Sequence, residues 1–234
     1  LNKRIMKFKF ITSVAFSILS LIAFGQVTTG KISYDVKLSS DNPQMTAYIS
    51  QMENSMLEIY FVGDKSRTDF YMGEMSTTNT ISSKDNDTTL VLLDNMFMGK
   101  VALKVTEDET EDNEMMNASK VRSVEIVEGE SKEIIGYKCK KAIVTFENDF
   151  VSEVWYTEDI VPGLRGGQFL FDEIKGLPLE MSSKSFGMDM QMEAYEFKGK
   201  LSKKDMQQKF SFDIPKGYTL KTAEDLKQMQ GGGR

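Results

Sequence analysis

Acidic side chains are the most numerous groups in this sequence that could perform acid–base chemistry. The chain carries 35 aspartate and glutamate residues against 29 lysines and arginines, which gives a formal net charge of −6. Three of the carboxylates, Glu153, Glu158 and Asp159, lie close together after an apolar stretch, and paired carboxyl groups serve glycoside hydrolases and aspartic proteases. An acidic solvated surface explains the same residues, and we favour that interpretation. The acidic balance also argues against nucleic acid and anionic membrane surfaces as partners.

Other catalytic and cofactor-binding patterns are missing from the sequence. The chain has no histidine, which excludes Ser-His-Asp and Cys-His catalysis and zinc sites that use histidine. Cys139 is the only cysteine, so all-cysteine zinc sites and dithiol redox chemistry are excluded, and its apolar neighbours predict a buried, unreactive thiol. No glycine-rich nucleotide-binding motif is present. The sequence therefore predicts a protein that is not an enzyme and that needs no cofactor or metal.

Methionines suggest binding more than chemistry. The chain has 16 of them, and methionine is flexible enough to line an adaptable apolar site. In residues 188–194, methionine and alanine alternate with polar residues, so one strand face is rich in methionine. These side chains could simply fill the core, and that alternative stays open. If they line an apolar cavity instead, we expect six residues in its wall: Tyr48, Met52, Trp155, Met188, Met190 and Met192.

The stretch Ile135–Ile160 predicts the β-hairpin that organises the fold. Two apolar, β-branched and aromatic runs flank a polar tip, and Asn148-Asp149 suits a two-residue turn. With that turn, Ala142 would lie opposite Trp155 and both would share one face of the hairpin. Because apolar residues occur on both faces, both are expected to be covered, or one covered while the other lines a cavity.

The remaining elements predict an α+β, mainly β fold. Residues Pro43–Ser55 place apolar side chains at helical spacing, with Asp41 or Asn42 as the cap, so we expect a helix there that packs on the sheet. Short strands with tight turns follow between Leu57 and Thr106, which favours consecutive antiparallel pairing. We therefore predict a strongly curved antiparallel sheet, a half-barrel, wrapped around one or two helices.

The ends of the chain predict export. Residues 1–25 combine a basic beginning with the apolar run Phe10–Phe24 and small residues before Gln26, which is typical of a signal peptide cleaved after Gly25. An uncleaved membrane anchor is the alternative, although the run is short for a membrane span. We predict a periplasmic or secreted protein with one domain over residues 26–230, a disordered tail over 231–234 and no transmembrane segment in the mature chain.

Four short segments carry a resemblance to a known family: GYKCKKA (Gly136–Ala142), EVWYTEDI (Glu153–Ile160), KGLPLEM (Lys175–Met181) and FDIPKGY (Phe212–Tyr218). Together they resemble an uncharacterised family of exported Bacteroidota proteins that carries a domain-of-unknown-function label. The chain is similar in layout to the GLPGLI proteins, but it departs from that motif and reads Gly-Leu-Pro-Leu-Glu over residues 176–180. Such families resemble the LolA-like envelope lipoprotein carriers, in which a curved antiparallel sheet wraps helices around an apolar cavity. The resemblance implies a lipid, an acyl chain or a lipoprotein as ligand, and it implies no catalytic residue.

Three functional hypotheses follow. The first is an exported, non-enzymatic protein that binds or carries a lipid or other apolar ligand in a cavity between the sheet and a helix. The second is a cell-envelope module for protein–protein interaction or assembly, with no small ligand. A hydrolase that uses carboxylates is a third, and it requires acidic residues that converge in a cleft.

Overall fold

The computed structural model describes residues 26–106, 120–164, 169–185, 187–222 and 225. The expected signal peptide and the expected disordered tail lie outside these residues. Twelve strands occur in the described part of the chain: β1 (Thr29–Ser39), β2 (Ser55–Val62), β3 (Lys65–Met72), β4 (Ser76–Ser83), β5 (Thr88–Asn95), β6 (Gly99–Thr106), β7 (Val121–Ile134), β8 (Tyr137–Phe146), β9 (Val151–Thr157), β10 (Leu177–Ser185), β11 (Met188–Lys198) and β12 (Thr219–Lys221).

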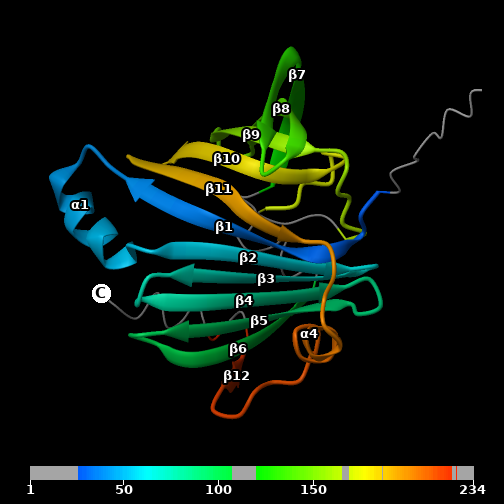
Figure 1. Cartoon of the computed structure of the whole chain (residues 1–234). Helices are drawn as coiled ribbons and strands as arrows, with labels where there is room; N and C mark the ends of the chain where they lie inside the picture. Colours follow the sequence, from blue (N-terminus) through cyan, green and yellow to red (C-terminus); the bar gives the residue numbers. More distant parts are fainter. Residues whose placement is uncertain (1–25, 107–119, 165–168, 186, 223–224, 226–234) are drawn as a thin grey trace, which may run out of the picture.

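All these strands belong to one sheet in the order β12-β6-β5-β4-β3-β2-β1-β11-β10-β9-β8-β7 (Figure 1). Every neighbouring pair runs antiparallel except the short β12, which pairs in parallel with β6. The prediction of a mainly β fold with a curved antiparallel sheet is confirmed, and so is the consecutive pairing from β2 to β6. β1 joins the two halves of the sheet because it pairs with β2 on one side and with β11 on the other.

The inner face of the sheet carries the main hydrophobic core. A cross-strand row shows this face, because its members lie directly opposite one another on neighbouring strands and all are buried. The row consists of Val36, Met192, Met181, Val154 and Ala142. Residues one position along each strand point to the opposite, outer face, since side chains alternate along a strand.

A connecting segment, not a helix, fills the interior. Phe169, Leu170, Phe171 and Ile174 are each at most 8% exposed and belong to the core cluster. The Phe169 ring meets Phe70 edge-on at 6.0 Å between centroids. These four side chains of the segment between β9 and β10 pack into the core of the curved sheet.

Both described helices lie outside this core. α1 (Pro43–Ile49) is capped by Asn42, whose side chain accepts a hydrogen bond from the Gln44 N–H, and a short 3-10 turn (Ser50–Met52) follows it. The predicted helix over Pro43–Ser55 is therefore too long, and the prediction that it packs on the sheet is wrong, because none of the α1 side chains is buried. The helix projects beyond the strand ends where β1 connects to β2 (Figure 1). α4 (Lys203–Gln208) begins with a capping box between Ser202 and Asp205.

The register of the predicted hairpin also differs from expectation. β8 and β9 form the hairpin, but its loop has three residues, since the Phe146 N–H donates to the Phe150 carbonyl oxygen. Asp149 adopts a left-handed φ of 66°. The extra loop residue places Val154, not Trp155, opposite Ala142. A one-residue shift moves every side chain of a strand to the other face, so Trp155 lies on the outer face.

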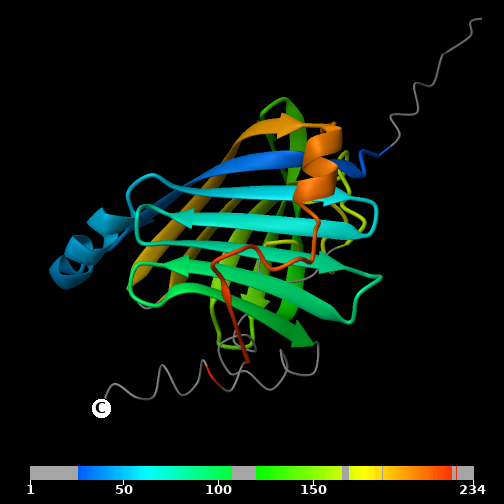
Figure 2. The same cartoon turned by 90° about the horizontal axis from the view of Figure 1, so that it is seen from below.

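A buried charged cluster fastens the C-terminal part of the chain to the outer face. The Asp69 carboxylate is fully buried and accepts hydrogen bonds from Arg67 Nε (2.5 Å), Asn79 Nδ2 (2.8 Å) and Lys209 Nζ (2.8 Å). Lys209 follows α4 directly, and its ammonium group lies 4.4 Å from the centre of the Tyr60 ring. This pairing satisfies the buried carboxylate and holds α4 against β2 and β3 (Figure 2).

Replacing the buried carboxylate should therefore destabilise the fold strongly. Asp69→Ala leaves Arg67 and Lys209 without their shared counter-charge, and the loss of one partner of a buried ion pair costs about 3–5 kcal/mol. The melting temperature should fall by roughly 10 °C for a chain of this size. Thermal unfolding followed by circular dichroism measures the change.

Asp94→Ala is the matched control. Asp94 pairs with Lys100, but its side chain is 43% exposed, and exposed ion pairs contribute at most about 1 kcal/mol. Equal effects of the two substitutions would contradict the structural role of Asp69.

Candidate functional site

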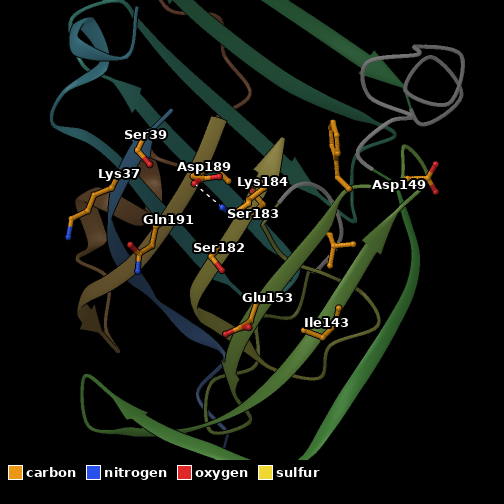
Figure 3. A pocket seen from close by; sticks show the side chains of 13 residues that line it. Lys37, Ser39, Ile143, Asp149, Glu153, Ser182, Ser183, Lys184, Asp189 and Gln191 are labelled. Carbon is orange, nitrogen blue, oxygen red and sulfur yellow. Dashed lines mark hydrogen bonds and ion pairs between the residues drawn. The ribbon is translucent and has the colours of Figure 1, made fainter. Parts of the chain in front are cut away.

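A groove on the outer face is the clearest candidate site. Five side chains from five neighbouring strands form its floor, and each lies directly opposite the next in the sheet register: Lys37 (β1), Gln191 (β11), Ser182 (β10), Glu153 (β9) and Ile143 (β8). Figure 3 shows these side chains arising from successive strands. Four strand spacings of about 4.8 Å make this row roughly 19 Å long.

The groove continues around the ends of the strands. A second row contains Ser39, Asp189 and Lys184, and the Lys184 ammonium lies 3.1 Å from an Asp189 carboxylate oxygen. The β8–β9 turn and the start of β9 contribute Asp149, Phe150 and Val151, and Ser183 and Met190 complete the lining. The whole groove has a volume of about 710 Å³ and is open to solvent.

The wall formed by the β8–β9 turn is fixed by an arginine from β7. Arg122 Nη1 lies 2.5 Å from Asp149 Oδ1, and Nη2 donates to the Glu147 carbonyl oxygen at 2.5 Å. These contacts hold the turn in one conformation, which keeps Phe150 and Val151 at the end of the groove. Because Arg122 is exposed, its ion pairs add little to the stability of the fold. Their main effect is on the shape of this wall.

Polar groups on the groove floor are free to bind a ligand. Within the described residues, the side chains of Lys37, Gln191 and Ser182 make no hydrogen bond or ion pair to the protein. An ammonium group with open donors thus lies in one row with an amide and a hydroxyl, which can both donate and accept. This arrangement suits a ligand that offers several hydroxyl or amide groups along its length.

The carboxylates of the groove, in contrast, are tied to cations or other donors. Glu153 accepts hydrogen bonds from Lys141 Nζ at 2.9 Å and from the Trp155 indole N–H at 3.0 Å. These two hydrogen bonds, the one from Lys141 first, lower the pKa of Glu153 below its usual range. Asp189 pairs with Lys184 and Asp149 with Arg122. The groove therefore presents no free carboxyl pair for acid–base chemistry.

Trp155 lies beside the groove beneath two lysines. The Lys132 ammonium is 4.4 Å and the Lys141 ammonium 5.6 Å from the centre of the indole ring. Lys132 also pairs with Glu180 at 2.5 Å. The indole is 8% exposed. Its N–H donates a hydrogen bond to the Glu153 carboxylate and so helps to hold that side chain in place.

The six residues predicted to line a cavity do not come together on one surface. Tyr48 is 44% exposed on α1, while Met52 is buried after that helix. The three methionines of β11 share the inner face: Met192 is 1% exposed, and Met188 and Met190 are half-buried. Trp155 lies on the outer face. Of the six, Met190 alone lines the groove among the described residues.

Sequence reasoning missed Lys37, Gln191 and Ser182. The signal was present for Gln191, because it belongs to the polar half of the alternation whose apolar half is the methionine face. Nothing in the local sequence places it beside Ser182 and Lys37, because their strands meet only through the order of the sheet.

The other chemically suggestive residues have structural partners. Glu158 pairs with Lys140 at 2.7 Å on the exposed end of the hairpin, away from the groove. Cys139 is fully buried, and burial raises the pKa of its thiol to about 11, in line with the expected unreactive residue. In the described part of the chain, no group of three or more acidic or cysteine side chains has the arrangement of a metal site. Within the same residues, no helix is both long and apolar enough to span a membrane.

Residues 87–211 match the family model described as N-glycanase peptide, N-terminal domain. The chain belongs to this family. A crystal structure of PNGF-II resembles it with a TM-score of 0.53 at 19% identity, over 86% of this chain and 33% of that chain. The chain thus spans about a third of the length of the PNGF-II structures that it matches. At this identity the similarity establishes a shared fold and says nothing about ligands.

Other solved structures show weaker similarity. An uncharacterised conserved protein from Thermus thermophilus has a TM-score of 0.48 at 10% identity, over 84% of this chain and 91% of that chain. A LolA superfamily protein from Nitrosomonas europaea has a TM-score of 0.34 at 8% identity, over 79% and 92% of the two chains. These similarities are too low to support an argument about function. No curated protein matches the chain, and the resemblance to exported Bacteroidota and GLPGLI proteins stays a prediction.

The lowered pKa of Glu153 makes a prediction about acid stability. Because the folded-state pKa lies below the unfolded value, the Glu153–Lys141 interaction contributes stability above the unfolded pKa and loses it as the pH falls through the folded pKa. Glu153→Gln should therefore be slightly less stable than the native chain at neutral pH, by at most about 1 kcal/mol because the pair is partly exposed.

This difference should vanish well below pH of about 4.3, where an unperturbed glutamate is protonated. Urea unfolding at neutral and acidic pH measures it, and Glu158→Gln is the control at an exposed pair outside the groove. A difference that persists unchanged in acid would show that the carboxylate charge is not the source of the stability.

Proposed function

We propose that the chain is a non-catalytic binding domain that holds the sugar-bearing segment of a glycoprotein in its outer groove. The observation that carries the proposal is the row of unpartnered polar side chains, Lys37, Gln191 and Ser182, along a floor roughly 19 Å long. Sugars and peptide bonds both offer the hydroxyl and amide groups that such a row can bind. The half-buried Phe150 and the exposed Val151 would pack against the apolar faces of the ligand.

Family membership supports the choice of ligand. The family model describes the N-terminal domain of an N-glycanase, a name that denotes action on N-linked glycans. The present chain corresponds in length to about a third of PNGF-II, so the proposal concerns recognition and leaves the cleavage reaction out. The tied carboxylates of the groove agree with this, because Glu153, Asp189 and Asp149 are each held by a cation.

A short peptide with one N-linked chitobiose tests the proposal. Isothermal titration calorimetry should detect its binding, and the same peptide without sugar should bind more weakly. Gln191→Ala and Ser182→Ala should each reduce the affinity roughly two- to tenfold, because each removes one hydrogen bond from the ligand. Their melting temperatures should change little, since within the described residues neither side chain makes a hydrogen bond or an ion pair to the protein.

Gln207→Ala is the matched control, because Gln207 is an exposed glutamine on α4, away from the groove. No binding of the glycopeptide, or equal binding by the control and the groove variants, would overturn the proposal. Equal affinity for the peptide with and without sugar would show that the groove binds the peptide and not the sugar.

An apolar ligand is the second candidate. The observation that favours it is the pair Met188 and Met190, which are half-buried on the inner face of β11, whereas Met192 farther along the same strand is 1% exposed. Titration with a fluorescent fatty acid tests this candidate. Saturable binding that Met190→Asp abolishes, and that Gln191→Ala leaves unchanged, would favour it over the glycopeptide.

We also propose that the chain acts outside the cytoplasm, in the periplasm or secreted. The support is the basic and apolar sequence of residues 1–25. Expression of the full chain in a bacterial host, fractionation and N-terminal sequencing should give a mature protein that begins at Gln26. A cytoplasmic protein that retains residues 1–25 would contradict export.

A further inference from the structure

The turn between β5 and β6 exposes large apolar side chains at a place that the groove does not use. Met96 is 66% exposed and Phe97 is 78% exposed, the two largest exposures among the large apolar residues of the described chain. They stand side by side at the tip of a hairpin that Gly99 closes with a left-handed φ of 72°. Adjacent exposed apolar residues of this size are unusual on a soluble surface and mark a contact site.

The backbone of this tip is already hydrogen-bonded within the protein. The Asn95 side-chain oxygen accepts from the N–H groups of Phe97 (2.8 Å) and Met98 (3.2 Å). The N–H of Met96 donates to the Met75 carbonyl oxygen at 3.1 Å. Three successive N–H groups therefore need no water, which lowers the cost of moving this segment into an apolar medium.

Packing beneath the tip makes it a rigid part of the fold. Met75 lies in the neighbouring β3–β4 turn and is 9% exposed. That turn packs closely on residues 51–53, because a Cβ at Gly73 would lie 2.5 Å from the Gln51 carbonyl oxygen. α1 and the β5–β6 turn thus border the same end of the sheet, as both views show (Figures 1 and 2).

Tyr48 adds a third exposed side chain at this end, with its ring 44% exposed on α1. A tyrosine combines an apolar ring with a polar tip, which suits the boundary between water and lipid. The charged side chains at this end of the sheet determine which kind of lipid surface it can approach. Glu53 and Glu74 are exposed and have no ion-pair partner within the described residues, while Lys100 is neutralised by Asp94.

We propose that the tip formed by Met96, Phe97 and Met98 inserts reversibly into a zwitterionic lipid surface, with Tyr48 at the boundary. Anionic lipids would be repelled by Glu53, Glu74 and the acidic chain as a whole, whose formal net charge is −6. Two or three apolar side chains provide less binding than a covalently attached acyl chain, which itself gives only marginal attachment. The association is therefore weak and exchanges readily.

Vesicle sedimentation with pure phosphatidylcholine tests the proposal. The native protein should sediment with the vesicles at high lipid concentration. Phe97→Ser should lower the partition coefficient roughly tenfold to a hundredfold, because it removes a side chain that is fully buried on insertion. Met206→Ser is the matched control, since Met206 is 41% exposed on α4, far from the tip. Circular dichroism melts check that both variants are folded.

A fluorescent reporter locates the contact. Phe97→Trp adds an exposed indole to a chain whose only tryptophan, Trp155, is 8% exposed. Its emission should shift to the blue on addition of vesicles, and brominated phosphatidylcholine should quench it. Adding phosphatidylglycerol to the vesicles should weaken binding, and salt should partly restore it because salt screens the repulsion.

Several outcomes would overturn the proposal. These are no sedimentation of the native protein, equal sedimentation of Phe97→Ser, or binding that requires phosphatidylglycerol. Concentration-dependent self-association in analytical ultracentrifugation, lost in Phe97→Ser, would identify a second copy of the chain as the occupant of the tip instead. The test is independent of glycopeptide binding, because none of the tip residues lines the groove.

Discussion

The arrangement of both surfaces depends on β1, the strand that joins the two halves of the sheet. It pairs with β2 on one edge and with β11 on the other. Tyr34 fixes it in place: the ring is fully buried and the hydroxyl donates to the Pro178 carbonyl oxygen at 2.6 Å. Burial raises the pKa of this phenol far above its usual range, so it remains neutral and available as a donor. Gly30 lets the strand approach Phe197, whose ring would lie 2.7 Å from an added Cβ.

The pairing of β11 with β1 determines what each face of β11 does. Met192 lies opposite Val36 and is buried in the inner core, while Gln191 lies opposite Lys37 and lines the outer groove. The same alternation thus supplies a packed interior and a polar surface from one strand. Because the Phe169–Ile174 segment packs into the inner core, the main apolar contacts of the fold lie on the inner face, and the outer face of β11 can present polar groups.

The fold class could be predicted from the sequence because it depends on local patterns. Alternating apolar residues and tight turns identified most of the strands, and the consecutive order of β2 to β6 followed from the short turns. The hairpin register could not be predicted, because it depended on one residue. Asp149 tolerates the left-handed conformation that a three-residue loop requires, and the resulting shift exchanged the faces of β9. Trp155 was therefore assigned to the wrong side of the sheet.

The groove was beyond prediction for a different reason. Its floor takes one residue from each of five strands, and two of these strands, β1 and β11, are far apart in the sequence and paired only in the folded sheet. Lys37 and Gln191 are ordinary polar residues when each is considered alone. The helix prediction was wrong because α1 is short. It has seven residues, too few to bury the apolar stripe that the spacing of its side chains suggested.

The geometry links the two proposed surfaces. Ser39 lies at the end of β1 and lines the groove, four residues before α1 begins at Pro43. α1 borders the same end of the sheet as the β5–β6 turn (Figures 1 and 2). A protein held at a lipid surface by Phe97 would therefore keep the strand-end opening of the groove near that surface. Ligands attached to the membrane would then meet the groove at a raised local concentration, which compensates for weak individual contacts. Weak polar contacts in the groove and weak apolar contacts at the tip would together select a ligand that is both polar and located at a membrane.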